Sequence, residues 1–446
     1  MSRALPAKPN LEFLRKQAKE LLQAFHQGDP AAIENFRSAH AAPKLAGALH
    51  VLARDYGFPN WPKLKDHVES LVRLMEPAVA LSKAVCASDA AKTARVLEQH
   101  PELKARLNEP MFNYDGMQAL LAAVQRSDRG TIDVLLQSGA DINARSHSWA
   151  GGIGVLDECG PAMAPFLIER GATLDTHAAA RLGMFDKLQE MVASDPDVVF
   201  RKGANGQTPL HLASTVEIAR YLVDHGAAID ARDLLHESTP AQHMLRVVQA
   251  RHYPRDRQDI ARFLVARGCL TDILMAAALG DHELTRRLLD RDPECVRTRV
   301  SNEYFPKQDP RSSGSIYYQL FGARTTPHMV ARDFGHEDIF RLLMERSPED
   351  LKTAQAFELG DETIFGSVIA ARPDFIATLS DAERRRLPDA AQNNNVEAVR
   401  LMLAAGWPVD AKGEHGLTAL DWGAWHGNAQ MIREVLRHHP QLELKD

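Results

Sequence analysis

The chain has 446 residues, 45% of them hydrophobic and 25% charged, and its formal net charge is −6. This slight acidic excess provides no basic surface of the kind that binds phosphates, so we expect no nucleic-acid partner. No apolar run approaches the roughly 18 residues of a membrane-spanning helix and no secretion signal opens the chain, so we expect a cytoplasmic protein without a membrane partner. The four cysteines lie far apart, which favours reduced, buried thiols over disulfides or a zinc site.

Residues 1–75 are expected to form a small helical module. Apolar residues recur at three- and four-residue steps over residues 10–28, which predicts an amphipathic helix that stops at Gly28. A short helix is expected to follow, from Pro30 to about residue 40. Next comes the segment at residues 45–65, which ends in the sequence ARDYGFPNWPKLK.

A pattern of two short helices recurs along most of the chain after residue 76. Its clearest copy is GQTPLHLASTVEIARYLVDHGAAID, residues 206–230. Thr208 can cap the first helix, and Pro209 suits its first position because a proline there leaves no amide hydrogen unpaired. The second apolar run stops at Gly226, where a helix end favours a left-handed residue. Each copy is therefore predicted to be one helix-turn-helix unit.

The Thr-Pro-Leu-His start of this copy and its Gly-Ala-Ala-Ile-Asp tail resemble an ankyrin repeat. Ankyrin repeats have a period of about 33 residues, and the spacing of the copies predicts about ten to eleven of them. The resemblance implies an all-α ankyrin-repeat solenoid with short β-hairpin loops over residues 76–446, in which His211 hydrogen-bonds within and between repeats. Residues 1–75 resemble the helical module that precedes ankyrin arrays in many bacterial proteins, and we expect them to cap the apolar end of the solenoid.

The repeat pattern breaks at residues 146–158, 233–257 and 301–322, and such irregular loops are candidates for a functional site. In the first loop, His147 and Trp149 precede glycines that allow the backbone to approach another group closely. Its Gly-Gly-Ile-Gly run lacks the strand and the lysine of a phosphate-binding loop, so we do not assign it that role. The alternative is a shortened helix with Trp149 packed on the neighbouring hairpin.

The second loop places His236 and Glu237 near a hairpin tip, where ankyrin proteins present contact residues. A metalloprotease His-Glu-x-x-His motif would need a histidine at Pro240, so no metal site of that kind is expected.

The third loop adds about fifteen residues to the expected hairpin between repeats. We expect an ordered flap over the concave face, with rings for stacking and cations to hold an anion or carboxylate. The residues expected to do so are Tyr304, Lys307, Arg311, Tyr317 and Tyr318. The alternative is that the aromatic residues only pack on the adjacent repeat.

A stripe of contact residues is expected on the inner face of the later repeats. The two positions before each inter-helix turn resemble the variable contact positions of ankyrin binders. These positions hold Asp333 and Phe334, Gln392 and Asn393, and Trp425 and His426, and the expected stripe runs through Phe334, Gln392 and Trp425. Trp422 is expected in the core.

Two functions are compatible with these features. In the first, the chain is an ankyrin-repeat scaffold that binds a protein or peptide partner on its concave face, as such proteins generally do. In the second, the three loops close the groove into a pocket for a small polar ligand, with hydrolase or lyase chemistry. Acid and base would then come from Asp157, His236, Glu237 and Tyr317, which requires two such groups within about 6 Å of each other. No cofactor or metal is expected in either case.

Overall fold

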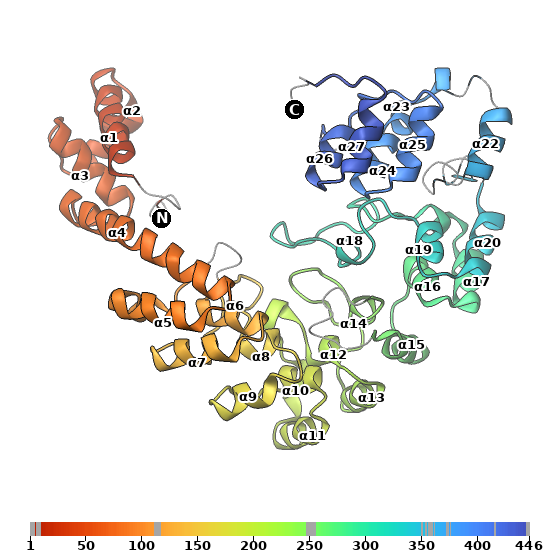
Figure 1. Ribbon diagram of the computed structural model, residues 1–446, viewed down its shortest axis with the longest axis horizontal. Helices are drawn as coiled ribbons and strands as arrows, with labels where there is room; N and C mark the ends of the chain where they lie inside the picture. Colours follow the sequence, from red (N-terminus) through yellow and green to blue (C-terminus); the bar gives the residue numbers. More distant parts are fainter. Residues whose placement is uncertain are drawn as a thin grey trace. The chain divides into compact units, whose positions relative to one another are not determined.

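The computed structural model describes residues 5, 10–110, 117–246, 256–348, 351–352, 355, 360, 362–371, 374, 376–413 and 416–442, and for residues 70–76, 363–364, 367–368, 371 and 382 it describes the backbone alone (Figure 1). Over these residues the regular elements are α-helices and short 3₁₀ helices, without a β-strand, so the predicted all-α fold is confirmed. None of the described helices has the length and the apolar surface that crossing a bilayer requires. Residue contacts divide the chain into two units: residues 1–148, 153–159 and 165–172 form the first, and residues 149–152, 160–164 and 173–446 form the second.

The helices of the first unit are α1 (Leu11–His26), α2 (Pro30–Ser38), α3 (Leu45–Asp55), α4 (Trp61–Cys86), α5 (Ala90–Gln99), the 3₁₀ helix η1 (Pro101–Arg106), α6 (Ala119–Gln125), α7 (Arg129–Gln137), α8 (Val155–Glu158) and α9 (Ala164–Glu169). The two helices predicted before residue 41 are thus confirmed as α1 and α2. The side chains of Asn10 and Asp29 accept hydrogen bonds from first-turn amides of these helices. Such caps satisfy amides that the start of a helix leaves unpaired.

The first four helices share one apolar core. α1 packs on α2 and α3, and α3 packs on α4, around buried residues that include Leu14, Phe36 and Leu64. α4 then continues to Cys86 and packs on α5 and α6, so one helix crosses the predicted domain boundary at residue 75. The capping role of residues 1–75 and the boundary at residue 75 both stay predictions.

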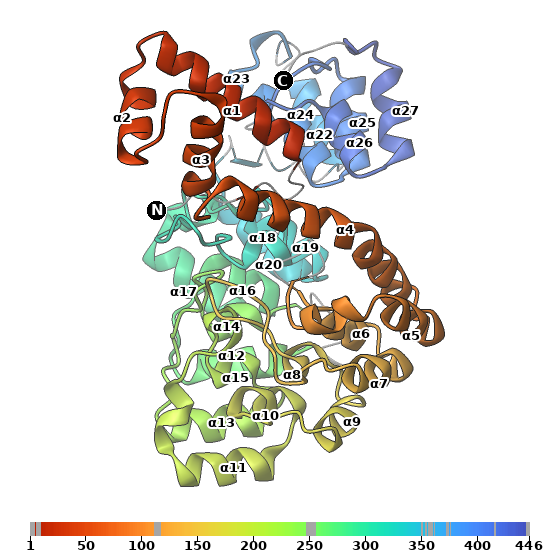
Figure 2. The same ribbon diagram turned by 90° about the vertical axis from the view of Figure 1, so that its left-hand side faces the viewer.

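The helices of the second unit are α10 (Thr176–Leu182), α11 (Phe185–Ser194), η2 (Pro196–Phe200), η3 (Ala204–Gly206), α12 (Pro209–Leu212), α13 (Val216–Asp224), α14 (Pro240–His243), α15 (Gln258–Ala266), α16 (Ile273–Leu279), α17 (His282–Arg291), η4 (Pro293–Arg297), α18 (Tyr317–Leu320), α19 (Pro327–Asp333), α20 (Glu337–Arg346), α22 (Glu362–Ala371), η5 (Ile376–Thr378), α23 (Asp381–Arg384), α24 (Arg386–Gln392), α25 (Val396–Ala404), α26 (Ala419–Trp425) and α27 (Ala429–Leu436). They pair as hairpins, and the hairpins stack (Figure 2). The first helices of neighbouring hairpins contact each other, α10 with α12, α12 with α14, α16 with α19 and α24 with α26. The second helices form their own row, α13 with α15, α17 with α20 and α25 with α27. The predicted solenoid is confirmed.

The repeat at residues 206–230 shows how one hairpin is joined to the next. The amide of Thr208, at the start of α12, donates to Nδ1 of His211 at 3.1 Å. Because that nitrogen accepts, the ring proton lies on Nε2, which donates to the carbonyl of Ser238 in the next repeat at 3.1 Å. His211 therefore links two repeats, as the resemblance implied. α13 stops before Gly226, whose φ of +91° is left-handed.

Two of the hairpin loops between repeats show how a backbone hydrogen bond closes them. The amide of Gly203 donates to the carbonyl of Gln207 at 2.8 Å, and Gly413 donates to Leu417 at 2.8 Å in a later repeat. The predicted short hairpins are therefore present, but no ladder of strand pairs develops in the described part of the chain.

Two first helices in the second unit are unusually short. α12 and α14 have four residues each, whereas α16 has seven. The guanidinium of Arg257 donates to the carbonyls of His211 at 2.9 Å, Ala213 at 3.3 Å and His243 at 3.1 Å. Arg257 is only 6% exposed, so it supplies donors to buried carbonyls that a further helical turn would otherwise have paired.

The four cysteines are free thiols. Cys159 and Cys269 are buried, as predicted, but Cys86 is exposed, so the expectation of buried thiols is wrong for Cys86. Burial raises the pKa of Cys269 to about 12, which keeps that thiol protonated and unreactive.

Candidate functional site

Parts of all three irregular loops meet in the second unit. The guanidinium carbon of Arg311, in the third loop, lies 4.4 Å from the ring centroid of Trp149, in the first. The amide of Ser313, also in the third loop, donates to the carbonyl of Leu235, in the second, at 2.8 Å. Whether this junction is reactive depends on what its acid and base groups contact. The part of the second loop at residues 247–255 lies outside the described residues.

The glycines of the first loop serve close packing of the backbone. Gly151 has a φ of +106°, and a Cβ there would lie 2.5 Å from the carbonyl oxygen of Gly203. The carbonyl of Gly151 accepts the amide of Asn205 at 3.2 Å. The predicted close approach is confirmed, and its partner is the backbone of the following hairpin. Trp149 is 39% exposed beside this contact, while His147 is exposed in the first unit.

His236 and Glu237 fasten the third loop to the second. The carboxylate of Glu237 accepts the amides of Gln308 at 2.8 Å and Asp309 at 2.6 Å. Nδ1 of His236 lies 3.1 Å from the carbonyl of Gly314 and donates to it. Both residues, predicted as contacts for a partner, thus bind the insertion of the same chain.

Glu237→Gln is expected to loosen the third loop. The amide group that replaces the carboxylate retains one acceptor and turns its own donor toward the second backbone amide. Hydrogen bonds to a charged group contribute about 1.5–3 kcal/mol, so exchange at Gln308 and Asp309 should accelerate by about 10- to 100-fold. Hydrogen exchange read by mass spectrometry measures this. Glu303→Gln, at an exposed glutamate of the same loop, is the control, and equal exchange in the two variants would contradict the assignment.

Tyr317 lies in the core of the second unit. It is fully buried, and its ring lies 5.2 Å from those of Phe305 and Phe321. Its hydroxyl donates at 2.7 Å to Asp272, whose carboxylate also caps α16 through the amide of Met275. Burial raises the pKa of Tyr317 well above its ordinary value, so the hydroxyl remains a donor. Tyr317 therefore does not face a ligand from a flap. It follows the alternative, in which aromatic residues of the third loop pack on the adjacent repeat.

The cations of the third loop are engaged within it. Nζ of Lys307 donates to the carbonyl of Ser312 at 2.9 Å, and the guanidinium of Arg311 pairs with Asp309 at 2.7 Å. Tyr304 is 37% exposed. An anion bound by these cations would have to compete with contacts that already order the loop.

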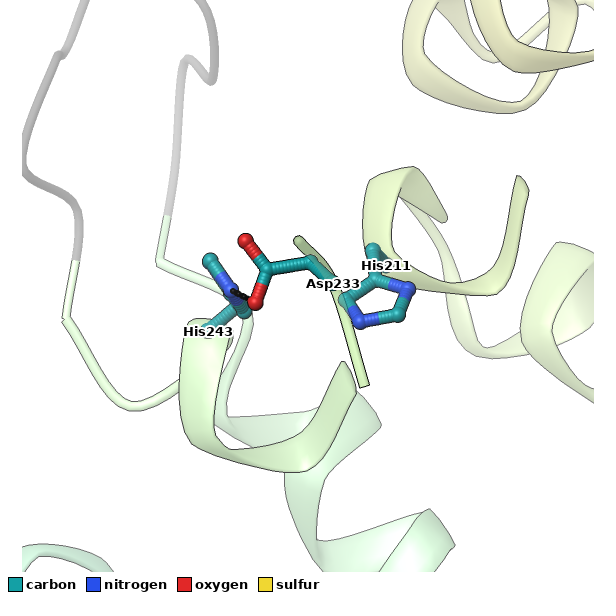
Figure 3. Close-up of side chains that lie close together, drawn as sticks. All are labelled: His211, Asp233 and His243. Carbon is teal, nitrogen blue, oxygen red and sulfur yellow. Dashed lines mark ion pairs between the residues drawn. The ribbon is translucent and has the colours of Figure 1, made fainter. Parts of the chain in front are cut away.

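Figure 3 shows that His211, Asp233 and His243 lie close together in the second unit. Nε2 of His243 is 3.5 Å from Oδ1 of Asp233, and the two side chains are 9% and 0% exposed. The ring centroids of His211 and His243 are 5.4 Å apart. Two imidazoles and a carboxylate are a donor set that zinc accepts, so the cluster is a candidate metal site by composition.

The candidate ligand atoms of His211 and Asp233 are already used in hydrogen bonds, so the cluster does not suit a metal ion. His211 accepts the Thr208 amide at Nδ1 and carries its proton on Nε2 toward Ser238, so neither ring nitrogen has a free lone pair. Oδ1 of Asp233 accepts the amide of Ser238 at 2.8 Å, and Oδ2 accepts the amide of His236 at 3.1 Å. These contacts fold the second loop, and the cluster is a buried structural network.

The four residues considered for acid-base chemistry all have structural partners. In the first unit, Asp157 accepts the guanidinium of Arg145 and the amide of Gly154, both at 2.7 Å, at the start of α8. The other three, in the second unit, bind the insertion or the core as described above. The contacts of these four residues therefore provide no support for the hypothesis that they act as an acid–base pair.

A hollow of about 410 Å³ opens beside the inner helices of the last repeats. It is lined by Tyr318, Phe321, Gly322 and Ala323 of the third loop and its end, by Gln392 at the end of α24 with Asn393 and Asn394 after it, and by Trp422 of α26 and His426 just after that helix. Four residues at predicted contact positions, Tyr318, Gln392, Asn393 and His426, thus come together. Trp422, expected in the core, is half-buried and forms part of the wall.

The polar side of the hollow consists of side-chain amides. Nε2 of His426 donates to the backbone carbonyl of Gln392 at 2.8 Å, and the side-chain amide of Asn428 donates to Oδ1 of Asn394 at 2.7 Å. The side-chain amides of Gln392 and Asn393 make no hydrogen bond to any described residue. Each offers a carbonyl acceptor and an NH₂ donor to whatever enters.

The most exposed indole of the described residues lies next to Trp422, a residue that lines the hollow. Trp425 is 78% exposed and packs edge to face against Trp422, with ring centroids 6.4 Å apart. Asp421 lies one turn earlier on the same face of α26. Its Oδ2 accepts the amide and hydroxyl of Thr418 at 2.8 Å and 2.7 Å. Tryptophan is one of the residue types enriched among the residues that dominate binding energy at protein interfaces.

Phe334 adjoins this surface from the other side. Its ring meets Phe321 edge to face at 6.1 Å. The guanidinium of Arg246 lies 4.6 Å from the centroid of Phe334 and also pairs with Asp333. One ring face of this predicted contact residue is therefore already covered.

Comparison with known proteins finds two matches to family models. Residues 205–234 match the model described as ankyrin repeat, and residues 387–433 match the model described as ankyrin repeats (many copies). No curated protein matches the chain. Among solved structures, the crystal structure of the human ASB11 ankyrin repeat domain is 18% identical, covers 60% of this chain and 99% of that chain, and has a TM-score of 0.29.

Proposed function

We propose that this chain, which contains ankyrin repeats, is a scaffold that binds a protein partner on the inner helices of its last repeats. The supporting observation is the 78% exposed indole of Trp425, which packs against Trp422 beside a hollow lined by aromatic rings and side-chain amides. Tryptophan is enriched among the residues that dominate binding energy at protein interfaces. The matched repeats at residues 387–433 contain both α24 and α26.

The third loop forms one wall of this binding surface. Tyr318 and Phe321 enter the hollow from it, while Glu237 and Tyr317 hold the loop to neighbouring repeats. A wall that is ordered before binding lowers the entropy lost when a partner docks. The insertion therefore serves recognition in this proposal by shaping the groove.

Trp425→Ala is expected to weaken partner capture by at least about 10-fold, since truncation of a central interface residue costs about 2 kcal/mol or more. The tagged full chain is used to capture proteins from a lysate of the cells that produce it, and retained proteins are quantified by mass spectrometry. Phe200→Ala is the matched control, because Phe200 is 52% exposed on an earlier repeat. Equal retention by the wild type and Trp425→Ala, across all specific partners, would refute the proposal.

A further inference from the structure

We infer that the segment bound in this hollow is an extended stretch of a partner protein that carries an arginine or a lysine, an inference that rests on the proposed function. It depends on three features: side-chain amides in the hollow that bond to no described residue, aromatic rings that line the hollow, and one carboxylate on the adjoining helix α26 that forms no ion pair with a described residue. Each of these restricts a different property of the ligand.

The free amides favour an extended backbone. Gln392 and Asn393 line the hollow with side chains that bond to no described residue. A side-chain amide pairs with a peptide group because each has one carbonyl acceptor and at least one N–H donor. The backbone N–H and C=O groups of a helical segment are already hydrogen-bonded within the helix, whereas an extended segment presents these groups to a groove.

The aromatic walls favour a flat or aliphatic group between them. Tyr318, Phe321, Trp422 and His426 all line the hollow, and Trp422 stacks on His426 at a centroid distance of 6.1 Å and an interplanar angle of 27°. The aliphatic stem of lysine and the planar guanidinium of arginine both pack on such rings while their charge stays accessible.

The charge next to the hollow favours a cation. Of the two aspartates on α24 and α26, Asp389 is paired with Arg324 at 3.2 Å. Asp421 is exposed, forms no ion pair with a described residue, and uses only Oδ2 in its cap. A cation over the indole of Trp425 would gain a cation–π contact and lie near this carboxylate. An acidic side chain would meet repulsion from both.

The test uses pools of unstructured nine-residue peptides whose central residue is arginine, glutamine or glutamate and whose other positions are randomised. Binding of the full chain is measured by fluorescence polarisation. The arginine pool is expected to bind at least about five-fold more tightly than the glutamine pool, with the glutamate pool weakest. Asp421→Asn should reduce the arginine preference to within about two-fold, since the carboxylate is then lost.

Further variants separate the three features. Asn393→Ala should weaken binding of every pool by about three- to five-fold and retain the arginine preference, because it removes a contact to the backbone. Glu397→Gln, an acid-to-amide change on the outer helix α25, should leave all affinities unchanged. Circular dichroism checks that each variant is folded.

The outcomes distinguish the inference from the function on which it rests. If glutamine or glutamate pools bind as tightly as the arginine pool, or if Asp421→Asn retains the preference, the basic ligand is refuted while partner capture through Trp425 stands. If no pool binds the wild type, the extended segment is refuted as well. If Trp425→Ala fails to weaken either the pools or the captured partners, the proposed function is lost together with the inference.

Discussion

Arg257→Met is expected to lower the free energy of unfolding by about 3–5 kcal/mol, since it removes the guanidinium donor from two buried carbonyls and one half-buried carbonyl, at about 1–3 kcal/mol for each buried group. These carbonyls belong to His211, Ala213 and His243, which lie at or just after the ends of α12 and α14. Methionine retains most of the buried volume, so the loss comes mainly from the missing hydrogen bonds. Urea unfolding followed by circular dichroism measures the change.

Arg267→Met provides the matched control for this prediction. Arg267 pairs with Asp224 at 2.7 Å, but both side chains are at least 40% exposed. Exposed pairs contribute about 0–1 kcal/mol, so this variant should unfold close to the wild type. If the two variants differ by less than about 1 kcal/mol, Arg257 does not support the short helices in the way its hydrogen bonds indicate.

Acidification from pH 7.5 to pH 5 is expected to destabilise the protein through its buried histidines. Burial lowers the pKa of His211 to about 3 and that of His328 to about 4. Above the unfolded pKa of about 6.5 both rings are neutral in either state, and their contribution to stability is fully present. Below about pH 6.5 these histidines bind protons in the unfolded chain but not in the folded chain. Each ring therefore lowers the free energy of unfolding by about 2 kcal/mol at pH 5.

Two other buried groups modify this pH dependence. Burial also lowers the pKa of His236, which acts in the same direction. Burial raises the pKa of Asp272, so its contribution to stability is present at low pH and is lost as the pH rises through its folded pKa. Because the three histidines destabilise the fold at low pH and only Asp272 acts in the opposite direction, the free energy of unfolding is still expected to fall as the pH is lowered.

The measurement is the free energy of unfolding between pH 4.5 and pH 7.5. His328→Asn removes one titrating ring, so the slope near pH 5 should fall by about 1.4 kcal/mol per pH unit. The same change at the exposed His282 controls for the substitution itself. A slope that His328→Asn leaves unchanged would show that this ring does not carry the acid sensitivity.

The fold was predictable because its determinants are local in the sequence. The helix-turn-helix unit at residues 206–230 follows from a threonine cap, a proline at the first helical position and a glycine at the end, all within one repeat. Once several such units follow one another, stacking is the way to bury their apolar faces. The three irregular loops were found for the same reason, since an insertion interrupts a regular spacing.

The chemistry of the loops was not predictable from spacing, because it depends on which repeat the insertion reaches. Adjacent tyrosines have different environments: Tyr317 is buried against Asp272, whereas Tyr318 lines the hollow. Arg257 carried no sequence signal, since its partners lie 14 to 46 residues earlier in the chain. Glu237 was expected to bind a partner protein, but its carboxylate instead accepts a backbone amide of the third loop.

The contacts between the second and third loops also bear on how this solenoid comes apart. A linear array of repeats loses its structure from the ends inward, because each repeat touches only its neighbours. Here hydrogen bonds join residues that lie far apart in the sequence: 71 residues separate Glu237 from Gln308, 78 separate His236 from Gly314, and 87 separate Arg246 from Asp333. The repeats between these hydrogen-bonded residues should unfold as one cooperative block, while the helices before them unfold one hairpin at a time.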